Sequence, residues 1–424
     1  MNALIVLLLL VAAAISSAPL FFVAAVLCIL RVAVYLWLRT AAGALRATRS
    51  CEHRVFYGDR ITVRIHVENA GPLPIPWLRL VEHRPGALIL PSVLTEVVAL
   101  GAGRRRELSY TMVGRQRGLH AVGPLFLTAG DAFGLSQQQL LLPQRQYLIV
   151  YPRLLAARDL GLPSFALFGD LRTQRRMLGD PARIAGVRDY RPGDPLHDIH
   201  WRATAAAGQL QVKQYQPSTS VQTLLVLDQH PAGYHTLDAL AAGELAISVA
   251  ATIAERLIDQ RQEVGLVTNG RLALLPPDED VPAELLRSQQ ELVASVLVTP
   301  SGAAEAAFAP ATVPIPAGRG RGQLMRLFEV LARLQLNDQG DPLRDLLLHP
   351  GLAPSWGSTM VVITGAAGSA LLASLHRLRE AGVLVELLVI DRRTAYGDLR
   401  AQAQALGVRF HVLWPDHDLP ALSA

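Results

Sequence analysis

Cysteine and lysine are almost missing from this sequence of 424 residues. The two cysteines, Cys28 and Cys51, are too few for a disulfide framework or for a cysteine-based zinc site. Lys213 is the only lysine among 40 basic residues, so arginine carries nearly all of the positive charge. Such an excess of arginine indicates a compositional bias, and the net charge of +5 is therefore weak support for nucleic-acid binding. We expect no nucleic-acid partner.

Charged residues are also scarce, at 18%, while hydrophobic residues make up 51% of the chain. This balance excludes a disordered or collagen-like chain and indicates that one segment lies in lipid. The uncharged stretch from Met1 to Leu30, which continues after Arg31 as far as Leu38, is that segment. Ser16-Ser17-Ala18-Pro19 interrupts it. The pattern therefore predicts a transmembrane α-hairpin over residues 1–40, with two spans of roughly 17 to 20 residues.

Arginines follow the second apolar stretch closely and set the expected orientation of the chain. The positive-inside rule places everything after residue 40 in the cytoplasm. A cleaved signal peptide is the alternative, but no basic residue precedes the apolar stretch. Arg31 either reaches the interface by snorkelling or marks the end of the second span. The arginines concerned are Arg39, Arg46, Arg49 and Arg54.

Residues 52–152 have the pattern of an all-β domain. From Ile61 to Val67, apolar residues alternate with polar ones, which is typical of a half-buried strand. Further short apolar runs, separated by glycine and proline, raise the expected number of strands to about seven and predict a β-sandwich. The run Arg104-Arg105-Arg106 is interpreted as a solvated hairpin tip, with contact to anionic lipid as the alternative.

Residues 221–424 alternate between strand-like and helix-like segments, after a connector and signature segment over 153–220. This alternation predicts a parallel, doubly wound α/β domain whose sites lie at the carboxyl ends of its strands. Asp228 stands at such an end. The whole chain is thus expected to be multidomain, with a membrane hairpin, a sandwich and a Rossmann-type α/β domain.

The most unusual stretch of the sequence runs from Gly186 to Lys213. Nine residues in it match an Arg-x-Tyr-x-x-Gly-Asp segment followed by Ile-x-Trp-Arg-x-Thr-Ala: Arg188, Tyr190, Gly193, Asp194, Ile199, Trp201, Arg202, Thr204 and Ala205. This stretch resembles the signature of the DUF58 family. Upstream, Gly123-Pro124 and Asp131-Ala132-Phe133-Gly134-Leu135 resemble two further segments of that family, with Ala132 in place of the usual proline. The resemblance implies a von Willebrand factor A-like domain in the carboxyl-terminal part, and MoxR-type AAA+ ATPases as partners.

The signature residues have two readings from their chemistry alone. Arginine forks and carboxylates can form a lattice that holds an irregular segment, with Trp201 packed as an apolar anchor. Alternatively, the same side chains form a surface that binds a partner or an anion. The candidates for that surface are Arg188, Tyr190, Arg191, Asp194, Trp201, Arg202 and Lys213. A third reading is an uncharacterised enzyme that uses Asp194 and Asp198 with His197 and His200.

A metal-binding A-domain requires Asp-x-Ser-x-Ser after its first strand and an aspartate after its fourth strand. Here the first loop reads Asp228-Gln229-His230-Pro231-Ala232, and Thr364 is followed by glycine. Asp228 and Thr364 are therefore interpreted as the remnant of a degenerate site that has too few oxygen ligands for magnesium. We expect no metal and no cofactor, and Asp228 is expected to bond loop amides or cap a helix.

Complete catalytic motifs are missing as well. Gly318-Arg319-Gly320-Arg321-Gly322 is rich in glycine but lacks the lysine and hydroxyl of a phosphate-binding loop, and it is interpreted as a solvated loop. No Gly-x-Ser-x-Gly motif occurs. The sequence therefore predicts a membrane-anchored, non-enzymatic adaptor. The resemblance to the DUF58 family implies that it lies in the inner membrane of a bacterium and works with a MoxR-type ATPase on an envelope or protein-assembly task. A magnesium-dependent adhesion module is the rival, and a client protein or a second copy of the chain are further candidate partners.

Overall fold

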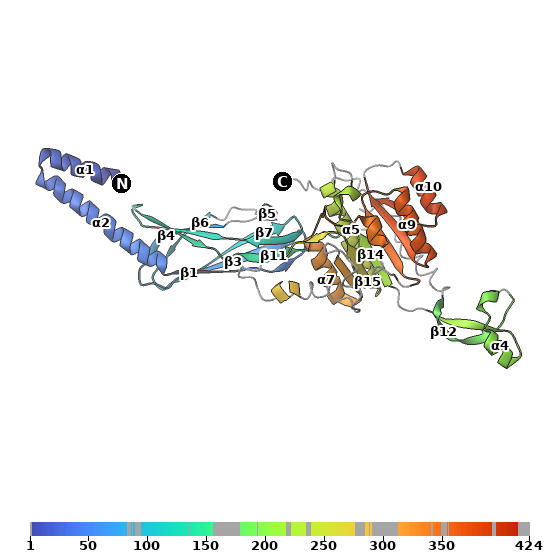
Figure 1. The fold of residues 1–424 in the computed structure, drawn as a ribbon. Helices are drawn as coiled ribbons and strands as arrows, with labels where there is room; N and C mark the ends of the chain where they lie inside the picture. Colours follow the sequence, from blue (N-terminus) through green and yellow to red (C-terminus); the bar gives the residue numbers. More distant parts are fainter. Residues whose placement is uncertain are drawn as a thin grey trace. The chain divides into compact units, whose positions relative to one another are not determined.

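A computed structural model divides the chain into two compact units. The first comprises Met1–Tyr151 and Leu274–Gln289, and the second comprises Pro152–Ala273 and Gln290–Ala424 (Figure 1). The structure describes residues 2–82, 86, 88–89, 95–134, 136–155, 179–192, 194–217, 222–234, 239–275, 285–287, 289–290, 313–340, 342–348, 354, 356–391 and 396–413. Most of the connector, together with Gly193 and Leu135 of the signature motifs, lies outside these ranges.

The first unit begins with two antiparallel helices, α1 (Asn2–Ile15) and α2 (Ala18–Gly43). Ser16 has a left-handed φ of 50°, which reverses the chain between them. At 1.5 Å per residue, α1 is about 21 Å long and α2 about 39 Å. Of the described helices, α2 alone is long and apolar enough to cross a membrane, with a mean hydropathy of 2.4. The prediction of two spans of roughly 17 to 20 residues is thus supported only for α2, because α1 has 14 residues and is shorter than a hydrocarbon core of about 30 Å.

Helix α2 also ends later than expected. It continues through Arg31 to Gly43, so the helix does not end at that arginine. Leu38 and Ala41, near its carboxyl end, belong to the buried core of the following β-domain. The indole nitrogen of Trp37 donates a hydrogen bond of 3.1 Å to the carbonyl of Pro74 in that domain. The last turns of α2 are thus part of the β-domain as well as of the apolar helix.

The β-domain contains three sheets with strand orders β1-β3-β7-β5, β10-β9-β4-β6 and β2-β11-β8. Ile61, Val63, Ile65 and Val67, all on β3, are fully buried, as their alternation with polar residues predicts. Their side chains pack with those of the facing sheet into one core. The strands are β1 Leu45–Ser50, β2 Arg54–Val55, β3 Arg60–Asn69, β4 Ile75–Glu82, β5 Leu88–Ile89, β6 Thr95–Leu100, β7 Arg105–Gly114, β8 Gly118–Val122, β9 Leu125–Gly130, β10 Gln137–Leu142 and β11 Gln146–Val150.

The second unit begins with an antiparallel pair of strands, β12 (Gly179–Asp189) and β13 (Gln211–Pro217). Between them lie a short 3-10 helix, η2 (Leu196–Asp198), and the helix α4 (Trp201–Ala207). The signature residues are on this hairpin.

A six-stranded sheet with the order β17-β15-β14-β19-β20-β21 forms the rest of the second unit. All neighbouring strands are parallel except β17, which runs antiparallel to β15. In chain order this arrangement is 3-2-1-4-5-6, the usual order of open α/β sheets that bind ligands at the junction of the first and fourth strands. The strands are β14 Gln222–Leu227, β15 Glu263–Thr268, β17 Val313–Gly318, β19 Thr359–Thr364, β20 Leu384–Ile390 and β21 Arg409–Leu413, with a small pair β16 Arg271–Leu272 and β18 Leu334–Gln335.

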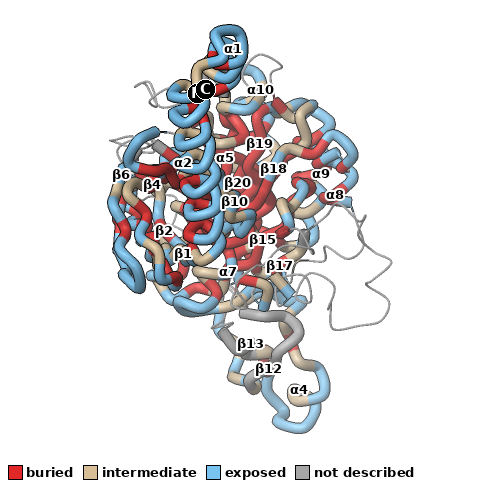
Figure 2. The backbone as a smooth tube through the Cα atoms, turned by 90° about the vertical axis from the view of Figure 1, so that its left-hand side faces the viewer, coloured by how far each residue is buried: buried red, intermediate tan, exposed pale blue. Residues whose placement is uncertain are grey.

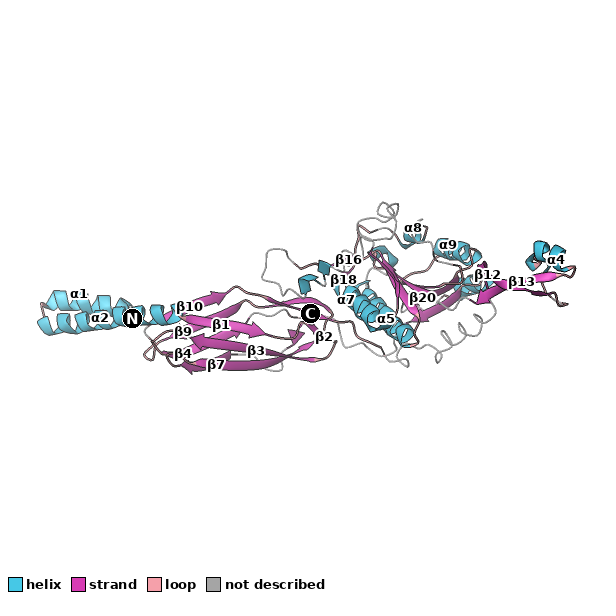
Figure 3. Cartoon of the chain, turned by 90° about the horizontal axis from the view of Figure 1, so that it is seen from below, coloured by secondary structure: helices cyan, strands magenta, loops and turns pink. Residues whose placement is uncertain are grey.

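Helices cover both faces of this sheet (Figure 3). Helices α8 (Leu343–Leu347), α9 (Ser369–Glu380) and α10 (Gly397–Ala405) share one apolar cluster with alternate residues of the central strands. Helix α5 (Ala239–Asp259) contacts the same strands and packs against α7 (Gly320–Arg333). The strand residues that alternate with those of the apolar cluster, and so point to the other face, are also buried. The sheet is therefore the buried centre of its unit (Figure 2). Assignment to the von Willebrand A class stays a prediction.

One local expectation needs correction. The glycine- and arginine-rich segment is not a free loop, because Gly318 ends β17 and Gly320 begins α7. Arg319, between them, donates to Glu263 at 2.8 Å.

Candidate functional site

The signature hairpin is closed by backbone pairing at the base of an irregular tip. Arg188 lies opposite Val212 and Asp189 opposite Gln211 in the register of β12 and β13. Beyond the strands, the Tyr190 amide donates to the Leu210 carbonyl at 2.9 Å. We name residues Tyr190–Leu210 the tip segment.

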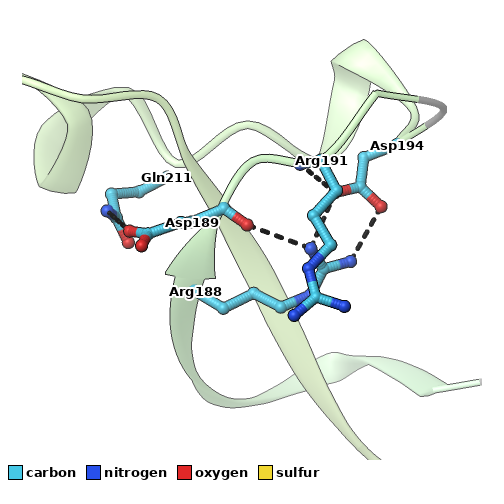
Figure 4. Close-up of polar contacts among 5 residues, drawn as sticks. All are labelled: Arg188, Asp189, Arg191, Asp194 and Gln211. Atoms are coloured by element: carbon cyan, nitrogen blue, oxygen red, sulfur yellow. Dashed lines mark hydrogen bonds and ion pairs between the residues drawn. The ribbon is translucent and has the colours of Figure 1, made fainter.

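An arginine fork holds the start of the tip segment in place. The two terminal nitrogens of Arg188 each donate to one oxygen of Asp194, both at 2.7 Å (Figure 4). The backbone amide of Arg191 donates to the same carboxylate at 2.9 Å. These donors hold the pKa of Asp194 at about 2, with the Arg188 bonds as the largest cause. A bidentate ion pair thus joins Arg188 to Asp194 at the start of the tip segment.

Hydrogen bonds of Gln211 and His200 hold the other side of the tip. Gln211 donates its side-chain amide to Asp189 at 2.6 Å, and its backbone amide donates to the Thr204 hydroxyl at 3.0 Å. His200 caps α4, because its Nδ1 accepts a bond of 3.1 Å from the Ala203 amide. Ile199 is buried and pairs with Val212 of β13. The sparse polar contacts thus give the tip a defined shape.

Trp201 does not pack as an anchor, which corrects the first reading of this residue. It is 68% exposed at the start of α4, and Leu196 of η2 is 71% exposed. Arg191 and Arg202 are exposed too, whereas Lys213 is half-buried on β13 opposite Val187. Large apolar side chains left in water on a short ordered segment are typical of a contact surface.

A second polar cluster lies at the junction of β14 and β19, where the strand order reverses direction. Asp228 is buried directly after β14. One of its carboxylate oxygens accepts from the His230 amide at 3.0 Å and from the Asn269 side chain at 2.9 Å. The other accepts from the Thr364 hydroxyl at 2.8 Å. Burial nevertheless raises the pKa of Asp228, because desolvation outweighs these three donors.

Asn269 is the residue that sequence reasoning missed at this cluster. Its amide oxygen accepts from the Gln229 backbone at 2.6 Å, and its backbone carbonyl accepts from the Asn337 side chain at 3.0 Å. Asn269 directly follows β15, which lies next to β14, so its place after a buried strand was the available signal. A neutral amide therefore lies directly beside the Asp228 carboxylate.

Comparisons with known proteins bear on both clusters. Residues 186–307 match the family described as "Protein of unknown function DUF58". This is the family whose signature the tip segment resembles. The chain is also 24% identical over 232 residues to the uncharacterized protein YeaD of Bacillus subtilis, which covers 50% of this chain and 53% of YeaD. The chain thus spans about half the length of the curated relative that it matches.

Solved structures resemble smaller parts of the chain. Alpha-2-macroglobulin from Escherichia coli is 17% identical, with a TM-score of 0.23 over 26% of this chain and 16% of that chain. The CARDB domain of a Pyrococcus furiosus protein is 15% identical, with a TM-score of 0.20 over 25% of this chain and 91% of that domain. Scores this low do not establish a shared fold.

The DUF58 match includes the tip segment, Asp228 and Asn269, but not Thr364. Within it, the side chains considered for enzyme or metal chemistry do not converge. Asp194 faces the Arg188 fork, and His200 uses Nδ1 to cap α4. His197 lies exposed with its Nε2 at 3.6 Å from Asp198. In the part of the chain that the structure describes, no three His, Cys, Asp or Glu residues form a group that could hold a metal ion.

Proposed function

We propose that this protein is a membrane-anchored adaptor that binds a partner protein through the tip segment of its DUF58 match. The observation that carries the proposal is the exposure of Trp201 on a segment that internal polar bonds hold rigid. Tryptophan is among the residues that contribute most to binding at protein interfaces, especially with arginine nearby. Arg191 and Arg202 are the arginines available here.

Preorganisation of the tip supports a binding role over a purely structural one. The fork of Arg188 on Asp194 and the Gln211 bonds fix the backbone around η2 and α4. A rigid binding segment loses less conformational entropy on association, so more of its contact energy appears as affinity. A segment whose only task was to close the hairpin would not need Leu196 and Trp201 in solvent.

The anchor in this proposal is helix α2. Large apolar side chains cover its surface, among them Phe21, Phe22 and Ile29, which are exposed along the helix. Arg39 and Arg46 follow the apolar part, and by the positive-inside rule they favour a cytoplasmic location for both units. In this arrangement α1 lies beside α2 without crossing the full bilayer.

The partner class comes from the DUF58 resemblance, which implies a MoxR-type AAA+ ATPase. The α/β domain is then the A-domain-like module of the family, with its metal position closed. Three donors already face Asp228, and that arrangement favours an adaptor over a magnesium-dependent grip on a partner's carboxylate.

Binding between purified components tests the proposal. The full-length chain in nanodiscs is titrated with a MoxR-type ATPase from the same organism, with ATP or ADP present, and Kd is measured by thermophoresis. Trp201→Ala is expected to weaken binding about 30-fold, the effect of losing about 2 kcal/mol at an interface centre.

Leu240→Ala is the matched control. Leu240 is 76% exposed near the start of α5, outside the tip segment, and its substitution is expected to change Kd by less than about twofold. Equal affinity of the Trp201 variant and the unchanged protein would contradict the role of the tip. Failure of every MoxR-type ATPase of the organism to bind would contradict the partner assignment.

A further inference from the structure

The carboxyl end of α2 and three chain reversals lie at one end of the β-sandwich. Leu45, just after α2, pairs with Asn69 at the end of β3. The Asn69 amide donates to the Arg104 carbonyl at 3.0 Å, and the Gly103 amide donates to the Gly71 carbonyl at 3.2 Å. The reversals 69–74 and 100–104 therefore lie beside the end of α2. We name this the helix-proximal end of the sandwich.

The third reversal lies at the same end, with residues 131–134 and 136 described. Strand β4 starts at Ile75, directly after the first reversal, and Trp77 pairs with Gly130 of β9. Gly130 also pairs with Gln137 of β10, so the turn between β9 and β10 extends past the start of β4. The indole of Trp77 donates to the Asp131 carbonyl at 2.9 Å and fastens the base of this turn.

The depth of this end follows from α2. About 20 helical residues cross a hydrocarbon core, and counting from Ala18 brings Trp37 to the interface. Trp37 bonds the Pro74 carbonyl in the first reversal, so that reversal begins at the level of the interface. With α2 in a bilayer, as the proposed function requires, the helix-proximal end lies at the lipid headgroups.

Basic side chains gather at this end. Arg39 on α2, Arg46 on β1, and Arg104 and Arg106 beside the second reversal are all exposed. Arg105 makes an ion pair of 3.0 Å with Glu68, which also lies opposite Arg46 in the strand register. The exposed charge is thus mainly positive, and it lies where phosphate groups of lipids would be.

An exposed phenylalanine accompanies these charges. Phe133 is 74% exposed at the tip of the third reversal. The buried carboxylate of Asp131 accepts from the Phe133 amide at 2.7 Å and from the Ser136 amide at 2.5 Å, which holds the turn in shape. An aromatic ring held in water at the same end of a domain as exposed arginines is typical of a surface that enters the membrane interface.

We propose that the helix-proximal end of the sandwich lies flat on an anionic membrane leaflet. Arg39, Arg46, Arg104 and Arg106 contact the lipid phosphates, and Phe133 enters the interfacial layer. This deepens the proposed function, because it rests on α2 as the anchor and adds a fixed orientation of the sandwich on the bilayer. The occupant of the surface is anionic phospholipid, favoured by charge complementarity and by continuity with α2.

Hydrogen exchange of the full-length chain in nanodiscs tests this proposal. Two lipid compositions are compared, phosphatidylcholine alone and phosphatidylcholine with about one third phosphatidylglycerol. The peptides covering 69–74, 100–106 and 131–136 are expected to exchange more slowly with the anionic lipid. Each arginine at an anionic surface contributes a factor of about five, so R104S/R106S is expected to remove up to roughly 25-fold of that protection.

Two further variants separate lipid docking from general damage. Phe133→Ser is expected to reduce protection of the 131–136 turn in the anionic nanodiscs. Arg115→Ser removes an exposed arginine just after β7, at the opposite end of the sandwich, and is expected to leave all three reversals unchanged. Equal exchange of the reversals in both lipids would overturn the proposal.

The same data distinguish this proposal from the anchor on which it rests. If α2 is protected in nanodiscs while the reversals exchange equally in both lipids, the docking surface is wrong and the anchor stands. If the amides of α2 themselves exchange as freely as an exposed helix, the anchor is wrong and the docking surface falls with it.

Discussion

Replacing Thr364 by valine tests the buried cluster at the junction of β14 and β19. Valine has nearly the shape of threonine but cannot donate to Asp228. Thr364 and Asp228 are both almost fully buried, and their oxygens are 2.8 Å apart. A hydrogen bond to a charged group is worth about 1.5–3 kcal/mol, so we expect T364V to lower the local opening free energy by about 2 kcal/mol.

Thr364→Ser is the matched control, since it keeps the hydroxyl and loses one methyl group, worth about 0.8 kcal/mol. Hydrogen exchange of β14 and β19 peptides in the full-length protein measures both variants. A loss of 2 kcal/mol corresponds to about 30-fold faster exchange in T364V. Equal effects of the two variants would refute the idea that the hydroxyl stabilises the carboxylate.

The pH dependence of this effect has a definite sign. Burial raises the pKa of Asp228 in the folded protein. The stability that this group contributes is therefore greatest below its ordinary pKa and decreases as the pH rises through the raised value. Below that value the carboxyl is protonated and the bond with Thr364 is neutral, so the loss in T364V should shrink to about 1 kcal/mol.

Two other predictions concern the remaining donors. Asn269→Asp brings a second carboxylate against Asp228, and we expect β14 peptides of this variant to exchange faster by a factor of about 30 or more. Millimolar magnesium is expected to restore the protection of these peptides in N269D and to leave the unchanged protein as it is. No response of N269D to magnesium would contradict the idea that the Asn269 amide takes the place of a cation beside Asp228. Arg188→Gln removes the main cause of the low pKa of Asp194, and carbon-13 NMR of that carboxyl should show its pKa returning from about 2 toward the ordinary aspartate range. Because a lowered pKa stabilises the fold above the ordinary value, the order of the tip should be lost as the pH falls toward 2 in the unchanged protein. An unchanged pKa in R188Q would contradict the bidentate bond.

Much of the secondary structure followed from short-range patterns. The strand predicted from Ile61 to Val67 lies within β3, and the alternation predicted for residues 221–424 appears in the order β14, α5, β15 and again in β19, α9, β20. Periodicities of 2 and 3.6 residues are properties of neighbouring positions, so a single sequence contains them. The helix α10 was not expected, because its polar sequence has little apolar periodicity.

The candidate sites were predicted less completely. The ion pair between Arg188 and Asp194 could be anticipated, because the two residues are six positions apart and a turn lies between them. The contact of Asn269 with Asp228 joins residues 41 positions apart on neighbouring strands, and no local pattern encodes it. The exposure of Trp201 could not be predicted either, because a tryptophan has the same sequence signal whether it is packed or in solvent.

The sequence by itself determined the apolar amino-terminal segment, the alternation of β3 and the alternation of strand-like and helix-like segments in residues 221–424, because each depends on local composition and spacing. Only the tertiary structure decided that α2 ends inside the core of the sandwich and that three distant reversals meet beside it. It likewise placed an amide beside the buried carboxylate of Asp228. These features depend on strand register and long-range packing, which bring together residues that the chain keeps far apart.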